Sequence, residues 1–265
     1  MLQLWIAAQR SDREIMRSTR QFGVTTNLVV PHRALAVGAH PDDIEFGCGA
    51  TLAKWAAQGC EVHLLVLTDG AKGTWDADAD IAALIQRRQS EQRAAADILG
   101  ATGVHLLDNV DGELQVTITE RARVCEVIRR TRPEVVLGHD PWQRYRLHPD
   151  HHAAGQLTID GIVAARDPHF FREQQLERHR PHTLLLFEAE VRDHVEIVTD
   201  FVDLKVEALL AHTSQYESTH GIAADPQSQT TEFRNGIVDD AHAAQREFDS
   251  SSDLLAEAFK RLNDL

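Results

Sequence analysis

Two short segments carry side chains that could bind a metal ion together and hydrolyse a bond. They read AHPDDIE at residues 39–45 and HPDHH at residues 148–152. Two histidines and one carboxylate, with water completing the coordination, are a ligand set typical of catalytic zinc, which keeps one position open. Zinc lowers the pKa of a bound water to roughly 7, so hydroxide becomes available at neutral pH. The segments therefore predict a catalytic zinc site. In it, a remaining carboxylate could accept the proton of the water and a remaining histidine could face a substrate carbonyl.

Each of these residues has a simpler explanation when it is considered alone. Asp42 or Asp43 could cap the helix that follows, because Asp is a preferred N-cap residue, and Asp150 could cap another helix. His40 could be an ordinary turn histidine. Three such groups within four residues are harder to explain in this way, so we favour the metal site.

Alternating apolar and helical segments indicate how the two segments could meet. We expect strands at 34–39, 61–70, 104–108 and 134–138, with helices between them at 47–59, 80–99 and 117–131. Right-handed crossovers leave the carboxyl ends of such strands on one edge, where ligands bind. The expected fold class is α/β, a Rossmann-like doubly wound and mostly parallel sheet with helices on both faces. Both segments then lie on its ligand-binding edge.

The remainder of the chain shows a less regular pattern. We expect a helix at 152–165, one or two strands within 183–198, a helix at 202–216, a long segment of low order at 217–238 and a final helix at 240–263. A loop of that length is often disordered or a lid over a site. We interpret residues 1–30 as an N-terminal extension and residues 31–265 as a single domain, with a C-terminal segment from about 217 to 265 that covers the substrate.

Composition limits the partners and the compartment. The formal net charge of −14 would repel phosphate backbones and anionic lipid headgroups, so neither nucleic acid nor a membrane surface is an expected partner. Cys48, Cys60 and Cys125 are odd in number and contain no CxxC pair, which is typical of reduced cysteines. We find no export signal and no membrane-spanning run. A cytoplasmic protein is expected.

Two other functions are compatible with part of the pattern. Gly47-Cys48-Gly49 resembles half of a dinucleotide-binding turn, but Asp42, Asp43 and Glu45 would repel a pyrophosphate at that helix N-terminus. A phosphate-accepting receiver domain also places paired Asp residues after its first strand. It has no use for the second segment.

Several longer motifs resemble the LmbE/PIG-L family of zinc-dependent N-acetylglucosaminyl deacetylases. They are AHPDDIEFGCGATLAKWAAQG, TDGAKGT, RRQSE and HPDHHAAG, and the resemblance spans about residues 33–215. The segment KVEALLAHTSQ (205–215) is similar to the family's K-x-x-A-x-x-x-H-x-S-Q helix. TDGxxGT and DPWxxYxxHPDH are most similar to the diacetylchitobiose deacetylase branch. The resemblance also implies a homo-oligomer, for which a hexamer is one form.

The resemblance implies a role for each residue of the two segments. His40, Asp43 and His151 would bind one Zn²⁺ ion per chain, and Asp42 would be the general base. His148 would polarise the substrate carbonyl or stabilise the oxyanion. Asp150 would orient His148.

The resemblance also implies substrate contacts. Arg88 and Asp111 match positions that contact sugar hydroxyls, although Arg88 could instead be a helix partner of Glu91. Tyr145 could cover the metal or be a surface tyrosine. His212 and His220 could reach the site, but we leave both out of the catalytic set.

The expected function is zinc-dependent removal of an N-acetyl group from a small molecule or oligosaccharide that contains N-acetylglucosamine. Zinc-bound hydroxide would attack the acetamide carbon and release acetate and a free amine. One alternative is an amidase that acts on a thiol-sugar conjugate of the mycothiol or bacillithiol type. Another is a non-catalytic zinc-binding module, although such a module would not need Asp42 and His148.

Overall fold

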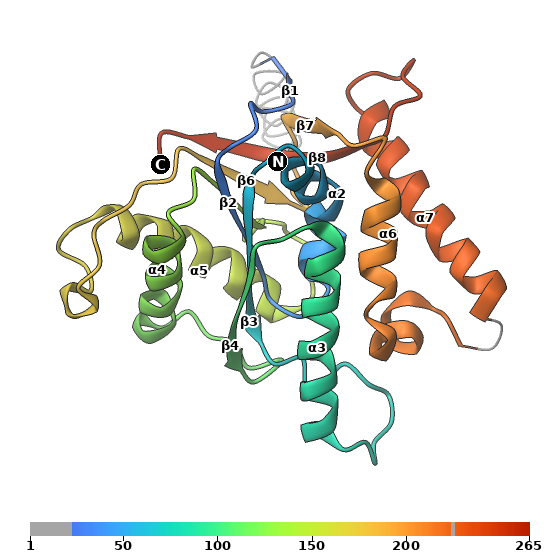
Figure 1. The fold of residues 1–265 in the computed structure, drawn as a ribbon, viewed down its shortest axis with the longest axis horizontal. Coiled ribbons are helices and arrows are strands. Elements are labelled where there is room, and N and C mark those ends of the chain that lie inside the picture. The colour runs from blue at the N-terminus through green and yellow to red at the C-terminus, as the bar shows by residue number, and fades with distance from the viewer. Residues whose placement is uncertain (1–22, 224–225) are drawn as a thin grey trace, which may run out of the picture.

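Eight strands form one sheet in the part of the chain that the computed structural model describes, residues 23–223 and 226–265 (Figure 1). The strands are β1 (Thr25–Thr26), β2 (Arg33–Gly38), β3 (Glu61–Thr68), β4 (Gly103–Asn109), β5 (Val135–His139), β6 (Thr183–Phe187), β7 (His194–Ile197) and β8 (Ala256–Asn263). Their order across the sheet is β1-β7-β8-β6-β5-β2-β3-β4.

The parallel centre of the sheet runs in the order β6-β5-β2-β3-β4. The chain moves outwards from β2 through β3 to β4 and then returns to β5 and β6 on the other side of β2. This is the strand order of a doubly wound sheet, so the expected fold class is confirmed. The reversal leaves β2 beside β5, and ligands bind at the carboxyl ends of the strands at such a switch point.

Helices cover both faces of the sheet. They are α2 (Asp43–Ala57), α3 (Ile81–Leu99), α4 (Ile118–Thr131), α5 (Pro149–Arg166), α6 (Val202–Leu210) and α7 (Pro226–Arg246), with shorter turns at Arg172–Gln174, Thr213–Gln215 and Tyr216–His220. Figure 1 shows α4 and α5 on one side of the sheet and α2, α3 and α6 on the other. Asp80 and Thr117 cap α3 and α4 by accepting backbone N–H groups.

The two apolar layers follow from the period of two along each strand. Leu35 and Val37 of β2 pack toward α4 and α5, and the intervening Ala34 and Ala36 pack toward α2. All four side chains are fully buried. Because both faces of β2 are covered, the strand is a continuous apolar run, as expected for a parallel sheet.

The C-terminal region differs from the sequence prediction. The single helix expected at 240–263 is wrong: α7 ends at Arg246, and Ala256–Asn263 is β8, which lies antiparallel between β6 and β7. The low-order segment expected at 217–238 is also wrong, because α7 begins at Pro226. The partners of β8 are distant in sequence, so its pairing left no local signal.

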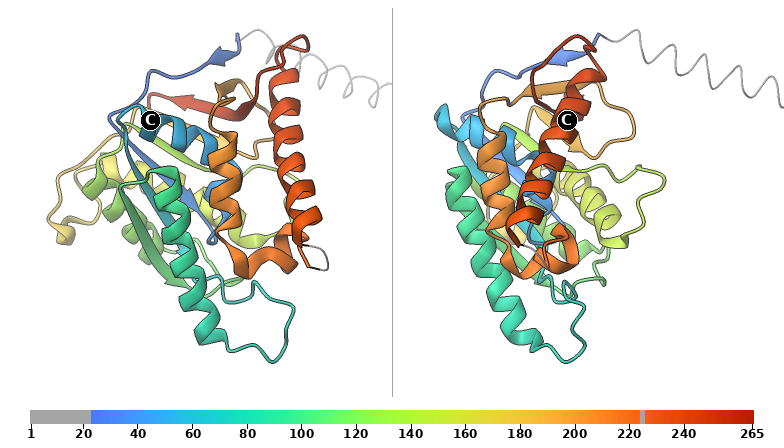
Figure 2. Two further views of the ribbon diagram at one scale, coloured as in Figure 1. Left: turned by 45° about the vertical axis from the view of Figure 1, so that its right-hand side comes forward. Right: turned by 90° about the vertical axis from the view of Figure 1, so that its right-hand side faces the viewer.

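Helix α7 has a pattern that explains its place. Phe233, Ile237 and Ala241 recur every four residues and pack with residues of α6. Figures 1 and 2 show α7 alongside α6. The helix expected at 202–216 ends earlier, at Leu210, where tighter turns take over.

Most of the N-terminal extension expected at residues 1–30 lies outside the described residues. Within the described part, Thr25–Thr26 pairs in parallel with β7 and extends the sheet by one strand. Across residues 23–223 and 226–265, we find no helix with both the length and the apolar character needed to cross a bilayer.

Candidate metal centre and active site

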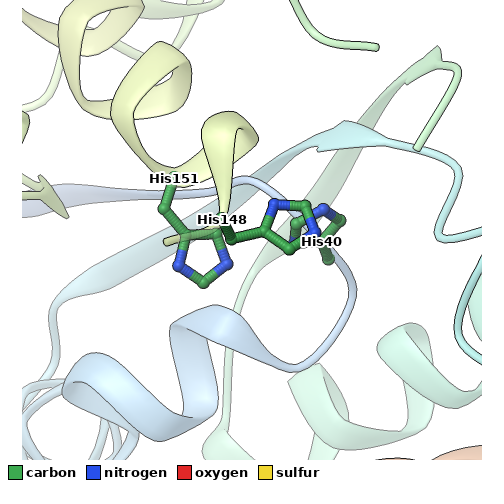
Figure 3. Close-up of side chains that lie close together, drawn as sticks. All are labelled: His40, His148 and His151. Atoms are coloured by element: carbon green, nitrogen blue, oxygen red, sulfur yellow. The ribbon is translucent and has the colours of Figure 1, made fainter. Parts of the chain in front are cut away.

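Both sequence segments lie at the switch point between β2 and β5. His40 and Asp43 follow β2, and His148 and His151 lie at the start of α5, which follows β5. Figure 3 shows the imidazoles of His148 and His151 beside that of His40. Two loops about a hundred residues apart in sequence therefore meet where the strand order predicts a ligand site.

The three residues expected to bind zinc lie in contact with one another. His40 Nδ1 is 3.2 Å from Asp43 Oδ2, and His151 Nε2 is 3.3 Å from Asp43 Oδ1. The ring centroids of His40 and His151 are 5.2 Å apart. Two imidazoles on either side of one carboxylate are chemically suited to a zinc ion.

Ligand atoms are grouped in more than one way around this point. Within the described residues, three overlapping sets place their ligand atoms within 4.8 Å of one another: His40, His148 and His151; His40, Asp111, His148 and Asp150; and Asp43, His139 and His151. Each expected ligand belongs to at least one set. The donor chemistry therefore fits a divalent ion, and small side-chain rotations would decide which set holds it.

The charges around His40 also fit a bound cation. Burial lowers the pKa of His40, but the carboxylates of Asp43, Asp111 and Asp150 outweigh it and raise that pKa to about 12. The Asp150 carboxylate is fully buried and the Asp111 and Asp43 side chains are nearly so. This excess of buried negative charge would be balanced by a metal ion.

Asp42 is not the helix cap that its position suggested. It occupies the N-cap position of α2, but its side chain makes no capping hydrogen bond within the described structure. Its carboxylate is buried 3.5 Å from the Arg88 guanidinium. Burial raises the pKa of Asp42 to about 7, although Arg88 opposes the shift. A carboxyl group with such a pKa is suited to general base catalysis near neutrality.

His148 and Asp150 interact differently from the expectation. His148 Nδ1 accepts a hydrogen bond from the Asp150 backbone N–H at 3.3 Å and so caps α5. The Asp150 carboxylate accepts the N–H groups of Gly112, at 2.7 Å, and Leu114, at 3.2 Å, and lies 3.1 Å from His40 Nε2. In this structure the Asp150 carboxylate therefore orients His40.

Arg88 is buried and directed at the backbone of the site. Its guanidinium donates to the carbonyl oxygens of Gly70, at 2.9 Å, and Pro41, at 2.6 Å. The alternative pairing with Glu91 belongs instead to Arg87, whose Nε lies 2.9 Å from Glu91 Oε1. Arg88 thus fixes the loop that carries Asp42.

Asp111 and Tyr145 lie in contrasting places. Asp111 Oδ1 is 3.2 Å from His40 Nε2, and its other oxygen accepts the backbone N–H of Lys72 at 2.9 Å. Tyr145 is 83% exposed and is not among the described residues that line the pocket. The structure brings Asp111 into the site and leaves Tyr145 on the surface.

A pocket of about 730 Å³ opens over the cluster. Its walls include His40, Asp42, Asp43, Arg88, Asp111, His148 and His151. Other lining residues come from the C-terminal region: Ile237, Asp240, Ala241 and Ala244 of α7 and Ala256, Glu257 and Ala258 of β8. The metal cluster and the C-terminal segment therefore share one cavity.

His139 and Glu188 also belong to the site, although neither was predicted from the sequence. His139 ends β5, stacks on His151 with ring centroids 4.3 Å apart, and places Nε2 3.3 Å from Asp43 Oδ2. Glu188 follows β6 and holds His139 Nδ1 at 3.1 Å. His139 directly follows the strand expected at 134–138, so its position at the carboxyl edge was the signal that could have identified it. Glu188 lies inside the range 183–198, where the ends of the expected strands were not predicted, so it carried no such signal.

Gly47 has a packing role in this fold. A Cβ atom at Gly47 would lie 2.5 Å from the ring of Phe187 in β6. The glycine therefore lets α2 approach the sheet closely, and the resemblance of this turn to a dinucleotide-binding motif has a structural explanation.

Comparisons with known proteins agree with this fold and identify the family. Residues 35–162 match the family model of the GlcNAc-PI de-N-acetylases, PIG-L. The chain is 35% identical over 187 residues to the diacetylchitobiose deacetylase of Thermococcus kodakarensis, covering 69% of this chain and 70% of the relative. It is 32% identical over 166 residues to the 1D-myo-inositol 2-acetamido-2-deoxy-alpha-D-glucopyranoside deacetylase of Kineococcus radiotolerans, covering 51% of this chain and 46% of the relative.

A solved structure gives the same result. The N,N'-diacetylchitobiose deacetylase from Pyrococcus horikoshii, in complex with its inhibitor MPG, has a TM-score of 0.77 at 25% identity, covering 88% of this chain and 84% of that one. The chain belongs to the PIG-L family of deacetylases, also called LmbE-like. The family membership expected from the motifs is confirmed, and the relatives support the expected deacetylase activity on an N-acetylglucosamine compound.

Proposed function

We propose that this chain is a metal-dependent N-deacetylase that hydrolyses the acetamide of a small molecule or oligosaccharide containing N-acetylglucosamine. One observation carries the proposal. The carboxylate of Asp42 is buried, does not cap α2, and lines the same pocket as His40, Asp43 and His151. A metal-binding module would need the last three residues only.

His40, Asp43 and His151 would hold the ion, and we propose Zn²⁺. When bound, the ion would polarise the acetamide carbonyl and lower the pKa of the attacking water. His139 lies against Asp43 and His151 and would fix the orientation of both.

Asp42 would accept a proton from the water while the water oxygen attacks the acetamide carbon. The carbon–nitrogen bond then breaks, and the departing amine takes up the proton that Asp42 accepted from the water, or a proton from the imidazolium form of His148. The products are acetate and a free amino sugar.

His148 would donate a hydrogen bond to the developing oxyanion. Its Nδ1 accepts the Asp150 N–H, so a neutral His148 carries its proton on Nε2. That nitrogen is free to face the pocket, because His148 is exposed and lines the cavity. A donor aimed at the oxyanion stabilises the transition state more than the ground state.

The volume of the pocket supports a substrate larger than one sugar. A cavity of about 730 Å³ lies in the range of roughly 300–1,000 Å³ that encloses drug-sized ligands. We propose that Arg88 and Asp111 border the sugar, that Tyr145 contacts groups at the mouth, and that the C-terminal segment covers the linked group.

Acetate release tests this proposal directly. We would incubate the purified enzyme with N-acetylglucosamine, diacetylchitobiose and an inositol-linked N-acetylglucosamine, and measure both acetate and free amine. Release from at least one supports the deacetylase. Release only from a thiol-conjugate amide would support the alternative amidase, and metal binding without any release would support the non-catalytic module.

A homo-oligomer and a cytoplasmic location belong to the same proposal. Cys48, Cys60 and Cys125 are free and buried, which fits a reducing compartment. Light scattering on the purified full chain would measure the oligomeric state.

A further inference from the structure

The backbone of Asp42 is held in an unfavourable conformation. Its φ of 102° and ψ of −25° lie in the left-handed region, which residues with a side chain adopt only at a cost. The cost is not explained by capping, because the Asp42 carboxylate makes no capping hydrogen bond to α2 in the described structure. Some other contact must hold this turn.

A buried amide makes that contact. Gln92 of α3 is fully buried, and its Oε1 accepts the backbone N–H of Asp42 at 3.1 Å. Its Nε2 donates to Glu45 Oε1 at 2.6 Å. The orientation of the amide is set by its partners, because a backbone N–H needs an acceptor and a carboxylate needs a donor.

Glu45 holds the Gln92 amide in place by accepting its N–H. Its carboxylate is fully buried, and Oε2 has no hydrogen-bond partner among the described residues. His212 Nε2 of the segment after α6 lies 3.8 Å away, just beyond hydrogen-bonding distance. Figure 1 shows α2, α3 and α6 side by side on this face. Glu45 of α2 is thus buried between Gln92 of α3 and His212, which follows α6.

Packing alone does not require these polar groups. The next inward-facing residues of α3, Ala95, Ala96 and Leu99, are apolar and buried. A leucine at position 92 would bury as well, without the need for two buried hydrogen-bonding partners. The polar chain from Glu45 through Gln92 ends on Asp42, whose backbone φ is positive and whose carboxylate lines the pocket.

We propose that Gln92, fixed by Glu45, is a positioning residue that holds Asp42 in its strained turn so that the carboxylate faces the pocket. The inference rests on the proposed function, in which Asp42 is the base.

The first test compares Gln92→Leu with Gln86→Leu. Gln86 lies on α3 and is exposed, so it serves as the matched control. We expect Gln92→Leu to lower kcat roughly tenfold to a hundredfold, with KM and metal content close to wild type. The control variant, Gln86→Leu, should have the kcat, KM and metal content of wild type. A loss of folded protein or of metal in proportion to kcat would indicate a merely structural role and overturn the proposal.

A double-variant cycle asks whether Gln92 acts through Asp42. In an Asp42→Asn background, we expect Gln92→Leu to cause no further loss of the residual kcat. If Gln92→Leu lowered kcat by the same factor in the Asp42→Asn background as in wild type, the result would contradict the proposal.

A charge swap provides the rescue. Gln92→Glu alone sets two carboxylates against each other, and we expect low kcat. In the double variant Gln92→Glu/Glu45→Gln, residue 92 still accepts the Asp42 N–H, and an N–H donor again faces a carboxylate. We expect at least about tenfold recovery of kcat over the single variant. No recovery, with both proteins folded, would contradict the proposal.

Hydrogen exchange measures the same contact without activity. We expect the peptide that contains the Asp42 amide to exchange faster in Gln92→Leu than in wild type or Gln86→Leu, because the amide loses its acceptor. Unchanged exchange would overturn the positioning role. Failure of wild type to release acetate would overturn the proposed function instead, and the exchange result would still decide the contact.

Discussion

The apolar layers of the sheet and the loop that follows β2 are both buried, but they differ in the polarity of the residues that they bury. Residues Ala34–Val37 of β2 are fully buried, apolar and regular. Directly after them, His40, Asp42 and Asp43 are 7%, 6% and 9% exposed, yet all are polar. Burying polar groups is unfavourable unless each is paired, and Asp42 adds backbone strain. The comparison indicates that the apolar layers stabilise the fold, whereas the polar loop residues lower the free energy of unfolding and are retained for catalysis.

The largest expected effect is a loss of activity, caused by a substitution in the loop after β2 that leaves the fold unchanged. Asp42→Asn removes the proton acceptor but keeps the shape, so kcat should fall by roughly a hundredfold to ten-thousandfold. Metal content and melting temperature should stay as in wild type. Asp76→Asn, in an exposed loop, is the control. Unchanged turnover in Asp42→Asn would reject Asp42 as the base.

A substitution in the apolar layers should have the converse effect: it should lower stability and leave activity unchanged. Leu65 of β3 is fully buried, so Leu65→Ala should lower the free energy of unfolding by about 2–5 kcal/mol. The kcat of the folded fraction should stay the same, because the residue lies in the core cluster away from the pocket walls. Ile118→Ala, at a 61% exposed position, should change stability by less than about 0.5 kcal/mol. Denaturant unfolding with activity assays measures both.

A third change should separate strain from function at one residue. Asp42→Gly relieves the left-handed conformation and removes a buried carboxylate, so the free energy of unfolding should rise by about 1 kcal/mol while turnover is lost. Asp108→Gly is the control, because Asp108 also has a positive φ, of 52°, but is exposed. A destabilised Asp42→Gly protein would mean that the turn is not strained.

The smallest effect is expected at Tyr145, for which we proposed a substrate contact at the mouth of the pocket. Tyr145 is 83% exposed, so Tyr145→Ala should raise KM by less than about threefold and leave kcat unchanged. An increase of tenfold or more would show that Tyr145 closes over the substrate.

The same contrast explains what could be predicted from the sequence. The strands of the parallel centre follow from continuous apolar runs, and the position of AHPDD and HPDH follows from the rule that crossovers gather carboxyl ends on one edge. Local pattern and topology were sufficient there. The two loops were therefore expected to meet before any contact was known.

Features that depend on distant partners could not be predicted in this way. β8 is a strand because β6 and β7 flank it, although its own sequence also fits a helix. Gln92 is one of several glutamines on α3, and only the fold brings it to Asp42. Asp150 lies two residues after His148, which it was expected to orient, but its carboxylate contacts His40. Spacing in sequence does not specify such side-chain directions.

The central claim is that the two loops share one catalytic ion, and metal analysis combined with acetate release tests it most directly. We predict about one zinc per chain in purified wild type, loss of acetate release on chelation, and recovery when zinc is added back. His151→Ala should lose both metal and release. A wild-type protein that holds no metal and keeps full acetate release in the presence of chelator would contradict the account.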